Sequence, residues 1–139
     1  MATATLYTPQ VLGLTIELAR YPLTDDLVLR AQARSKSCGS TIMLGLAIGP
    51  DGAVERIGIR SQACAIGQAA AAIFAGGAVG RSAAQIEQAR EAIGAWLVGE
   101  AALPDWPGFS AILAARDYPA RHGAVLLPWN AAAEALQDA

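Results

Sequence analysis

The residues of this sequence that are best suited to chemistry are its two cysteines, Cys38 and Cys64. Arg34 and Lys36 precede Cys38, and Cys64 stands just before a predicted helix. Positive charge and the amino end of a helix both favour the thiolate, which is the form of cysteine that binds metals or attacks. We therefore take Cys38 and Cys64 as candidate metal ligands. We identify no candidate catalytic residue and no residue for an organic cofactor.

A β-hairpin is predicted between the two cysteines. Its first strand is indicated by apolar residues at alternate positions, namely Ile42, Leu44, Leu46 and Ile48. A Gly-Pro-Asp-Gly turn follows over residues 49–52, and residues 54–60 form the second strand. Pairing Ile42 with Ile59 gives a good match of the apolar faces and would place Cys38 opposite Ala63.

The hairpin would bring the cysteines together. Cys38 and Cys64 are equally far from Asp51 at the centre of the turn. Residues equidistant from a turn face each other in an antiparallel pair. A shift of register by one pair still leaves both cysteines at the open end of the hairpin, so we expect them to be neighbours.

Further elements precede the hairpin. Thr8 is a suitable cap for a helix that has Pro9 at its first position and continues to Arg20. Residues 27–35 alternate between apolar and polar side chains, which predicts a half-buried strand.

Helices dominate the sequence after Cys64. An alanine-rich helix is predicted to end at Gly76-Gly77, and Ser82 with Gln85 forms a capping box that opens a helix closed at Gly99. Residues 100–120 read as irregular, with one helical turn near residues 109–115. A last helix is expected to follow Pro128. The predicted fold class is α+β: a three-stranded antiparallel sheet with helices packed on one face, in a single domain over residues 1–139.

Composition narrows the classes of function. Hydrophobic residues make up 54% of the chain and charged residues 16%, and the formal net charge is −2, so neither nucleic acid nor an anionic membrane is an expected partner. The longest apolar run, residues 69–79, is too short for a membrane helix. Without a signal-like start we expect a cytoplasmic protein, where thiols stay reduced. No phosphate-binding loop or nucleophile elbow occurs, so no enzyme class is indicated.

Three segments of the sequence resemble the U-type (NifU-like) family of iron–sulfur cluster assembly scaffolds. Cys38-Gly39-Ser40 resembles the family's first Cys-Gly-Asp motif, and the segment Ala63-Cys64-Ala65-Ile66 resembles the second cysteine motif. The segment from Arg121 to Trp129 resembles the third. The resemblance implies the NifU-like fold, binding of iron or an iron–sulfur cluster, and two kinds of partner, a cysteine desulfurase and recipient apoproteins.

The sequence departs from that family pattern at two positions. Ala124 stands where the family has its third cysteine, and Ser40 replaces the aspartate that helps to make the family's cluster labile. His122, two positions before Ala124, is a candidate substitute ligand. A cluster needs four protein ligands, usually cysteine thiolates. A homodimer that shares Cys38 and Cys64 of both chains, or a ligand from a partner or a small thiol, would complete the set.

Other interpretations stay open at this stage. Zinc is a possible metal, and the cysteines could instead cycle as a dithiol and disulfide, or be inert small apolar residues. The fold could also be a decayed scaffold that serves only in protein contact.

Overall fold

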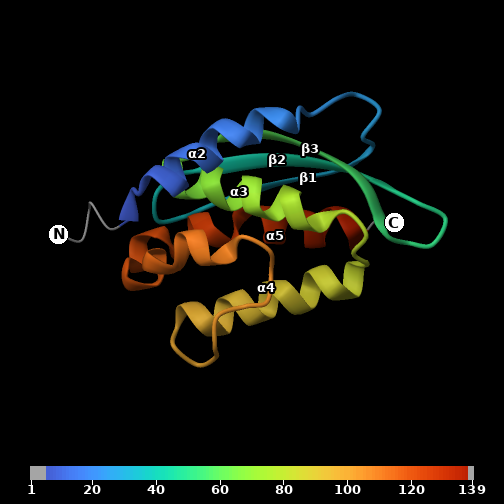
Figure 1. Cartoon of the computed structure of the whole chain (residues 1–139). Helices are drawn as coiled ribbons and strands as arrows, with labels where there is room; N and C mark the ends of the chain where they lie inside the picture. Colours follow the sequence, from blue (N-terminus) through green and yellow to red (C-terminus); the bar gives the residue numbers. More distant parts are fainter. Residues whose placement is uncertain (1–5, 138–139) are drawn as a thin grey trace.

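The computed structural model describes residues 6–137 and has an α+β architecture (Figure 1). Three antiparallel strands form one sheet in the order β1-β2-β3, and the helices pack on one of its faces. The elements, in chain order, are α2 (Pro9–Glu17), η1 (Leu18–Arg20), β1 (Leu29–Arg34), β2 (Thr41–Ile48), β3 (Val54–Gln62), α3 (Ala65–Ala78), α4 (Ala83–Leu97), η2 (Phe109–Asp117), η3 (Pro119–Arg121) and α5 (His122–Gln137). The predicted fold class is confirmed.

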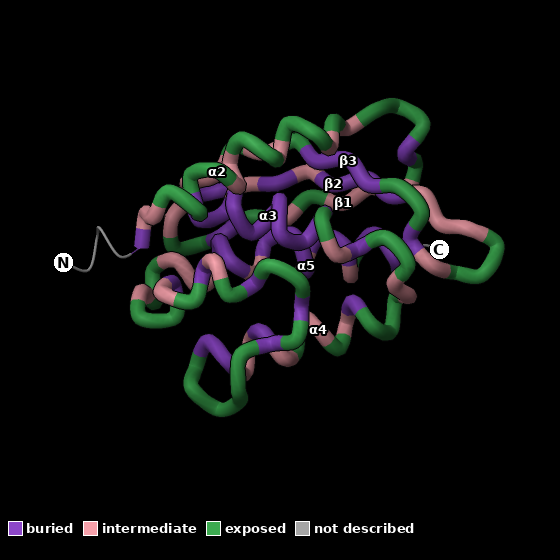
Figure 2. Tube along the Cα trace, viewed as in Figure 1, coloured by how far each residue is buried: buried purple, intermediate pink, exposed green. Residues whose placement is uncertain are grey.

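The core lies between the sheet and the helices. Helix α5 packs against β1 and β2, α3 packs against α5, and α4 covers α5 from the side away from the sheet. Figure 2 shows that buried residues concentrate in β2, α3 and α5. Aromatic side chains fill the middle: Phe74 stacks on Trp106 with ring centroids 5.5 Å apart, and Trp129 meets Phe74 edge-on at 5.4 Å. Burial of such large side chains is the main stabilising contribution to this fold.

Both predicted helix starts are confirmed in detail. The Thr8 hydroxyl accepts the Val11 N–H at 3.1 Å at the start of α2. At the start of α4 the Ser82 hydroxyl accepts the Gln85 N–H at 3.2 Å, and the Gln85 side chain accepts the Ser82 N–H at 2.9 Å. No helix within residues 6–137 is long and apolar enough to cross a membrane.

The hairpin exists as predicted, but its register differs by two residues. Leu44 pairs with Ile59 rather than with Ile57, and a bulge between Ala47 and Ile48 shifts the register near the turn. A shift of two preserves which side chains face the core, so the apolar pattern could not detect the error.

A pair of glycines explains the register that the hairpin adopts. Gly45 lies opposite Gly58 on the outer face of the sheet, where the segment from Pro22 to Leu27 crosses over both. A β-carbon would come within 2.9 Å of Leu27 Cβ if added at Gly45, and within 2.6 Å of Leu27 Cδ1 if added at Gly58. This loop, rather than a helix, covers the outer face of the apolar first half of β2.

Two predicted helix boundaries are wrong. Helix α3 continues through Gly76-Gly77 to Ala78. Gly77 does not end the helix but makes room for Trp106, since a β-carbon at this position would lie 2.5 Å from Trp106 Nε1. The last helix, α5, begins at His122 and includes Pro128 in its interior. An internal proline costs a helix about 3 kcal/mol, and the complete burial of Trp129 and Leu127 on either side offsets that cost.

Candidate metal centre

The loop that carries Cys38 is a tight turn between β1 and β2. Two backbone hydrogen bonds close it: Ser35 N–H to the Ser40 carbonyl at 2.8 Å and Gly39 N–H to the Ser35 carbonyl at 2.9 Å. Gly39 has a φ of +72°, a left-handed conformation that glycine adopts without steric cost. The sequence motif Cys-Gly-Ser thus fixes the position of the first thiol through its backbone.

Two serine hydroxyls contact the Cys38 thiol. The sulfur lies 3.4 Å from Ser35 Oγ and 3.1 Å from Ser40 Oγ, and both serines are buried. Hydrogen bonding to Ser35, then to Ser40, lowers the pKa of Cys38 from 9.0 to about 7. We expected Arg34 and Lys36 to favour the thiolate, but neither is among the causes of this shift. The two hydroxyls outweigh them because they contact the sulfur directly.

Cys64 stands at the N-cap of α3 and shares Ser40 with Cys38. Its backbone N–H donates to Ser40 Oγ at 3.0 Å, so one hydroxyl contacts both cysteine residues. The Cys64 side chain is also the last of the causes that lower the pKa of Cys38. Both thiols are free and partly exposed. The structure therefore brings together the two residues that the sequence singled out.

The start of α5 lies against the same loops. A β-carbon added at Gly123 would meet Ser35 Oγ at 2.6 Å, so glycine is required for this close approach. Ala124 is fully buried, and a β-carbon at Gly67, in the first turn of α3, would lie 3.6 Å from Ala124 Cβ. The alanine thus stands beside the helix start that Cys64 caps, where a longer side chain could take part in the site.

His122 does not complete a ligand set in this structure. Its Nε2 lies 2.7 Å from the Arg116 carbonyl, which can only accept, so this nitrogen carries a proton and donates it. Among residues 6–137, no three cysteine, histidine or acidic side chains come together as a metal-binding group. The described protomer offers two sulfur ligands and no third.

Arg121 is a residue of the site that the sequence analysis used only as part of a motif. The Tyr7 phenol is the largest cause that raises the pKa of Arg121, and the charges of Cys64 and Cys38 add to it. Negative charge on the thiols is therefore felt by this guanidinium. Its position just before α5 could have been noted from the sequence, but its partner Tyr7 lies at the other end of the chain.

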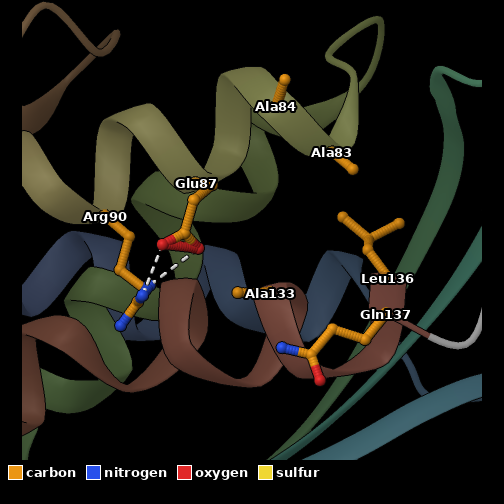
Figure 3. A pocket seen from close by; sticks show the side chains of 7 residues that line it. All are labelled: Ala83, Ala84, Glu87, Arg90, Ala133, Leu136 and Gln137. Atoms are coloured by element: carbon orange, nitrogen blue, oxygen red, sulfur yellow. Dashed lines mark hydrogen bonds and ion pairs between the residues drawn. The ribbon is translucent and has the colours of Figure 1, made fainter.

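A hollow between α4 and α5 has no chemistry comparable to that of the two cysteines. It is drawn in Figure 3 with the Glu87–Arg90 ion pair on one side and Leu136 and Gln137 on the other. It lies at the carboxyl end of α5, whereas Ala124 lies in the first turn of that helix. The cysteines and the residues that contact them therefore lie away from this hollow, near the first turn of α5.

The donor set determines what the cysteine site can do. Two adjacent thiols, one with a pKa of about 7, suit soft metals such as iron or zinc. Four ligands are normal for a structural zinc ion or an iron–sulfur cluster, so two must come from outside this chain. A site that supplies only two of four ligands suits a transiently bound guest better than a permanently bound metal.

Comparisons with solved structures agree with this architecture. The chain is 29% identical to the N-terminal part of a nitrogen-fixing NifU-like protein from Brucella abortus, with a TM-score of 0.83 over 99% of this chain and 96% of that one. A putative iron–sulfur cluster assembly scaffold protein for the SUF system from Fervidobacterium islandicum AW-1 shares the fold at 17% identity, with a TM-score of 0.84 over 94% and 96% of the two chains.

A third solved structure, titled a hypothetical protein, is 20% identical, with a TM-score of 0.71 over 91% of this chain and 96% of that one. No protein-family model matches the sequence, and no curated protein matches it. The likeness to known proteins therefore rests on the solved structures alone.

Proposed function

We propose that this chain, a member of the U-type family of iron–sulfur cluster assembly scaffolds, holds iron or a nascent [2Fe–2S] cluster through Cys38 and Cys64. The observation that carries the proposal is the contact of both cysteine residues with one buried hydroxyl, that of Ser40. This hydroxyl joins two residues that lie far apart in the sequence, which supports a guest shared by both.

The missing ligands define how the scaffold would work. Ala124 leaves the protomer with two thiolates, so the guest needs further ligands from a second copy of the chain or from another molecule. Fewer protein ligands make release easier, which suits a carrier that passes its cargo on. The proposed partners are a cysteine desulfurase that supplies sulfur and the apoproteins that receive the cluster.

Anaerobic reconstitution with iron and sulfide tests this function. We expect the wild-type protein to gain visible absorption, and we expect Cys38→Ala and Cys64→Ala to lose it. Ser61→Ala is a matched control, because Ser61 lies on neighbouring β3 and its buried hydroxyl has no partner among the described residues. A wild-type protein that stays colourless at concentrations that permit dimers would contradict the proposal, and the mass of the loaded protein distinguishes a shared homodimer from a loaded monomer.

A dithiol redox function is the second candidate, favoured by the adjacency of the thiols and by the pKa of Cys38 near 7. In that case the two thiols would pass two electrons and two protons to a disulfide of a substrate, which becomes two thiols, and a cellular dithiol would then reduce the disulfide formed here. Measurement of the reduction potential of the pair separates the two candidates: a potential far from the cytosolic glutathione poise would exclude cycling there.

A further inference from the structure

A cavity adjoins the cysteine site on the side of η3. Its volume is about 370 Å³, and it is lined by Leu6 and Tyr7 on one side and by residues 117–121 on the other. Ligand pockets for small molecules begin at roughly 300 Å³, so an amino-acid-sized guest fits. Leu6, Pro119 and Ala120 are the apolar residues of the lining, and Tyr7, Asp117, Tyr118 and Arg121 carry its polar groups, with Asp117 exposed.

Two buried polar atoms of the residues that line this cavity have no hydrogen-bond partner in the described part of the chain. Tyr118 Oη and Arg121 Nε are both buried, and neither has a hydrogen-bond partner within residues 6–137. A guanidinium nitrogen can only donate, so its missing partner is an acceptor. A buried donor without a partner is destabilising, and a carboxylate that entered the cavity could remove that cost after a small side-chain adjustment.

The cavity and the thiols share a wall. Ala120, which lines the cavity, accepts a hydrogen bond at 2.9 Å from the hydroxyl of Ser37, the residue before Cys38. Gly123 packs on Ser35, and Ala124 follows it. Arg121 therefore lines the cavity and stands three residues before Ala124, where the ligand set is short by a sulfur.

We propose that the cavity binds a small thiol that carries a carboxylate: Arg121 and Tyr118 hold the carboxylate, and the thiol supplies the ligand that Ala124 cannot. This inference rests on the proposed function for its second half only, since carboxylate binding to the metal-free protein does not depend on it. The thiol of the guest would lose its proton to solvent, and its sulfur would replace a water molecule on the metal held by Cys38 and Cys64.

The first experiment measures carboxylate binding by the reduced, metal-free protein with propionate and 3-mercaptopropionate, by calorimetry or NMR. We expect both to bind, and we expect Arg121→Gln to weaken both about tenfold or more. Arg20→Gln is the matched control, because Arg20 is an exposed arginine at the end of η1, and it should bind as the wild type does. Absence of binding to the wild type, or equal binding to Arg121→Gln, would overturn the proposal whatever the protein does with iron.

The second experiment uses Co²⁺ as the metal and reads the sulfur-to-cobalt charge-transfer absorption. We expect 3-mercaptopropionate to increase this absorption in the wild type at concentrations about tenfold lower than ethanethiol, which has no carboxylate. The advantage should vanish in Arg121→Gln. If ethanethiol works equally well, or if cobalt drives dimerisation and the added thiol changes nothing, the carboxylate-thiol site is wrong. If the wild-type protein binds no cobalt before any thiol is added, the result instead contradicts the scaffold function itself.

Discussion

The two ends of the β2–β3 hairpin are held by different kinds of contact. At the turn, backbone groups bond to one another: Gly49 N–H to the Ala53 carbonyl at 2.9 Å, Val54 N–H to the Arg81 carbonyl at 2.9 Å, and Gly80 N–H to the Val54 carbonyl at 2.8 Å. At the open end, backbone hydrogen bonds also close the Cys38 loop, but side-chain hydroxyls contact the cysteines themselves. Main-chain hydrogen bonds persist after most side-chain substitutions, whereas a single substitution removes a hydroxyl. Function can thus be altered at the open end without loss of the fold.

The largest expected effect comes from restoring a sulfur at the open end. Ala124→Cys would place a third thiol beside Cys64 and should raise the affinity for Zn²⁺ about a hundredfold, because each thiolate adds a strong ligand. Competition with a metal-binding dye measures the affinity. The matched control is Ala132→Cys, a fully buried position further along the same helix, which should leave the affinity unchanged. Equal affinities of the two variants would show that Ala124 does not face the site.

Removal of the hydroxyls tests whether they, and not the basic residues, control the first thiol. Ser35→Ala should raise the pKa of Cys38 from about 7 towards 9.0, and Ser40→Ala should raise it by less, because Ser35 is the larger cause. The rate of alkylation by iodoacetamide as a function of pH measures the pKa, in a background with Cys64→Ala. Ser61→Ala should have no effect, and a shift in Arg34→Gln that matches that of Ser35→Ala would contradict the assignment.

The pH dependence of stability sharpens the same contrast. The pKa of Cys38 is about 7 in the folded chain and 9.0 when unperturbed, so the folded state binds the proton less tightly. The stabilisation from its thiolate is complete above about pH 9 and is lost as the pH falls through about 7. Urea unfolding between about pH 6.5 and 8.5 should show the wild type gaining stability relative to Cys38→Ser as the pH rises. A constant difference across that range would exclude a lowered pKa.

The smallest effect is expected at the turn. Asp51→Ala removes the exposed hydrogen bond from Ala53 N–H to Asp51 Oδ1 at 3.1 Å. It should cost about 0.5–1 kcal/mol of unfolding free energy and leave zinc affinity and thiol reactivity as they are. Urea midpoints give the first quantity. A change in thiol reactivity in this variant would show that the two ends of the hairpin are coupled and would break the comparison.

Local rules predicted most of the elements of this fold. Thr8 and Ser82 start helices because their hydroxyls cap free N–H groups, a property of a few neighbouring residues. Predictions failed where distant residues decide. Trp106 fills the space that a side chain at position 77 would need. Pro128 is tolerated within α5 because the residues next to it are buried in the core.

The site was predictable only in part for the same reason. The position of the predicted turn placed Cys38 and Cys64 together at the open end of the hairpin. The error of two residues in the register does not alter the faces of the strands, because side chains alternate with a period of two. The hydroxyl of Ser35 gave no signal, since a serine in a loop is ordinary and this one packs against Gly123 of α5. Ser40 was noted only as a replacement for aspartate, and its contacts with both cysteines were not predicted. Arg121 was missed because its neighbours Tyr7 and Cys64 come from remote parts of the sequence.

The shared hydroxyl of Ser40 has a consequence for the order of loading. Under the proposed function, a guest atom on the Cys38 sulfur would compete with the hydrogen bond between that sulfur and Ser40 Oγ, the oxygen that also accepts the N–H of Cys64. Occupation of the first thiol would then change the anchoring of the second. The two thiols would act as a cooperative pair, in which capture at one sulfur prepares the other to close on the cargo or to let it go.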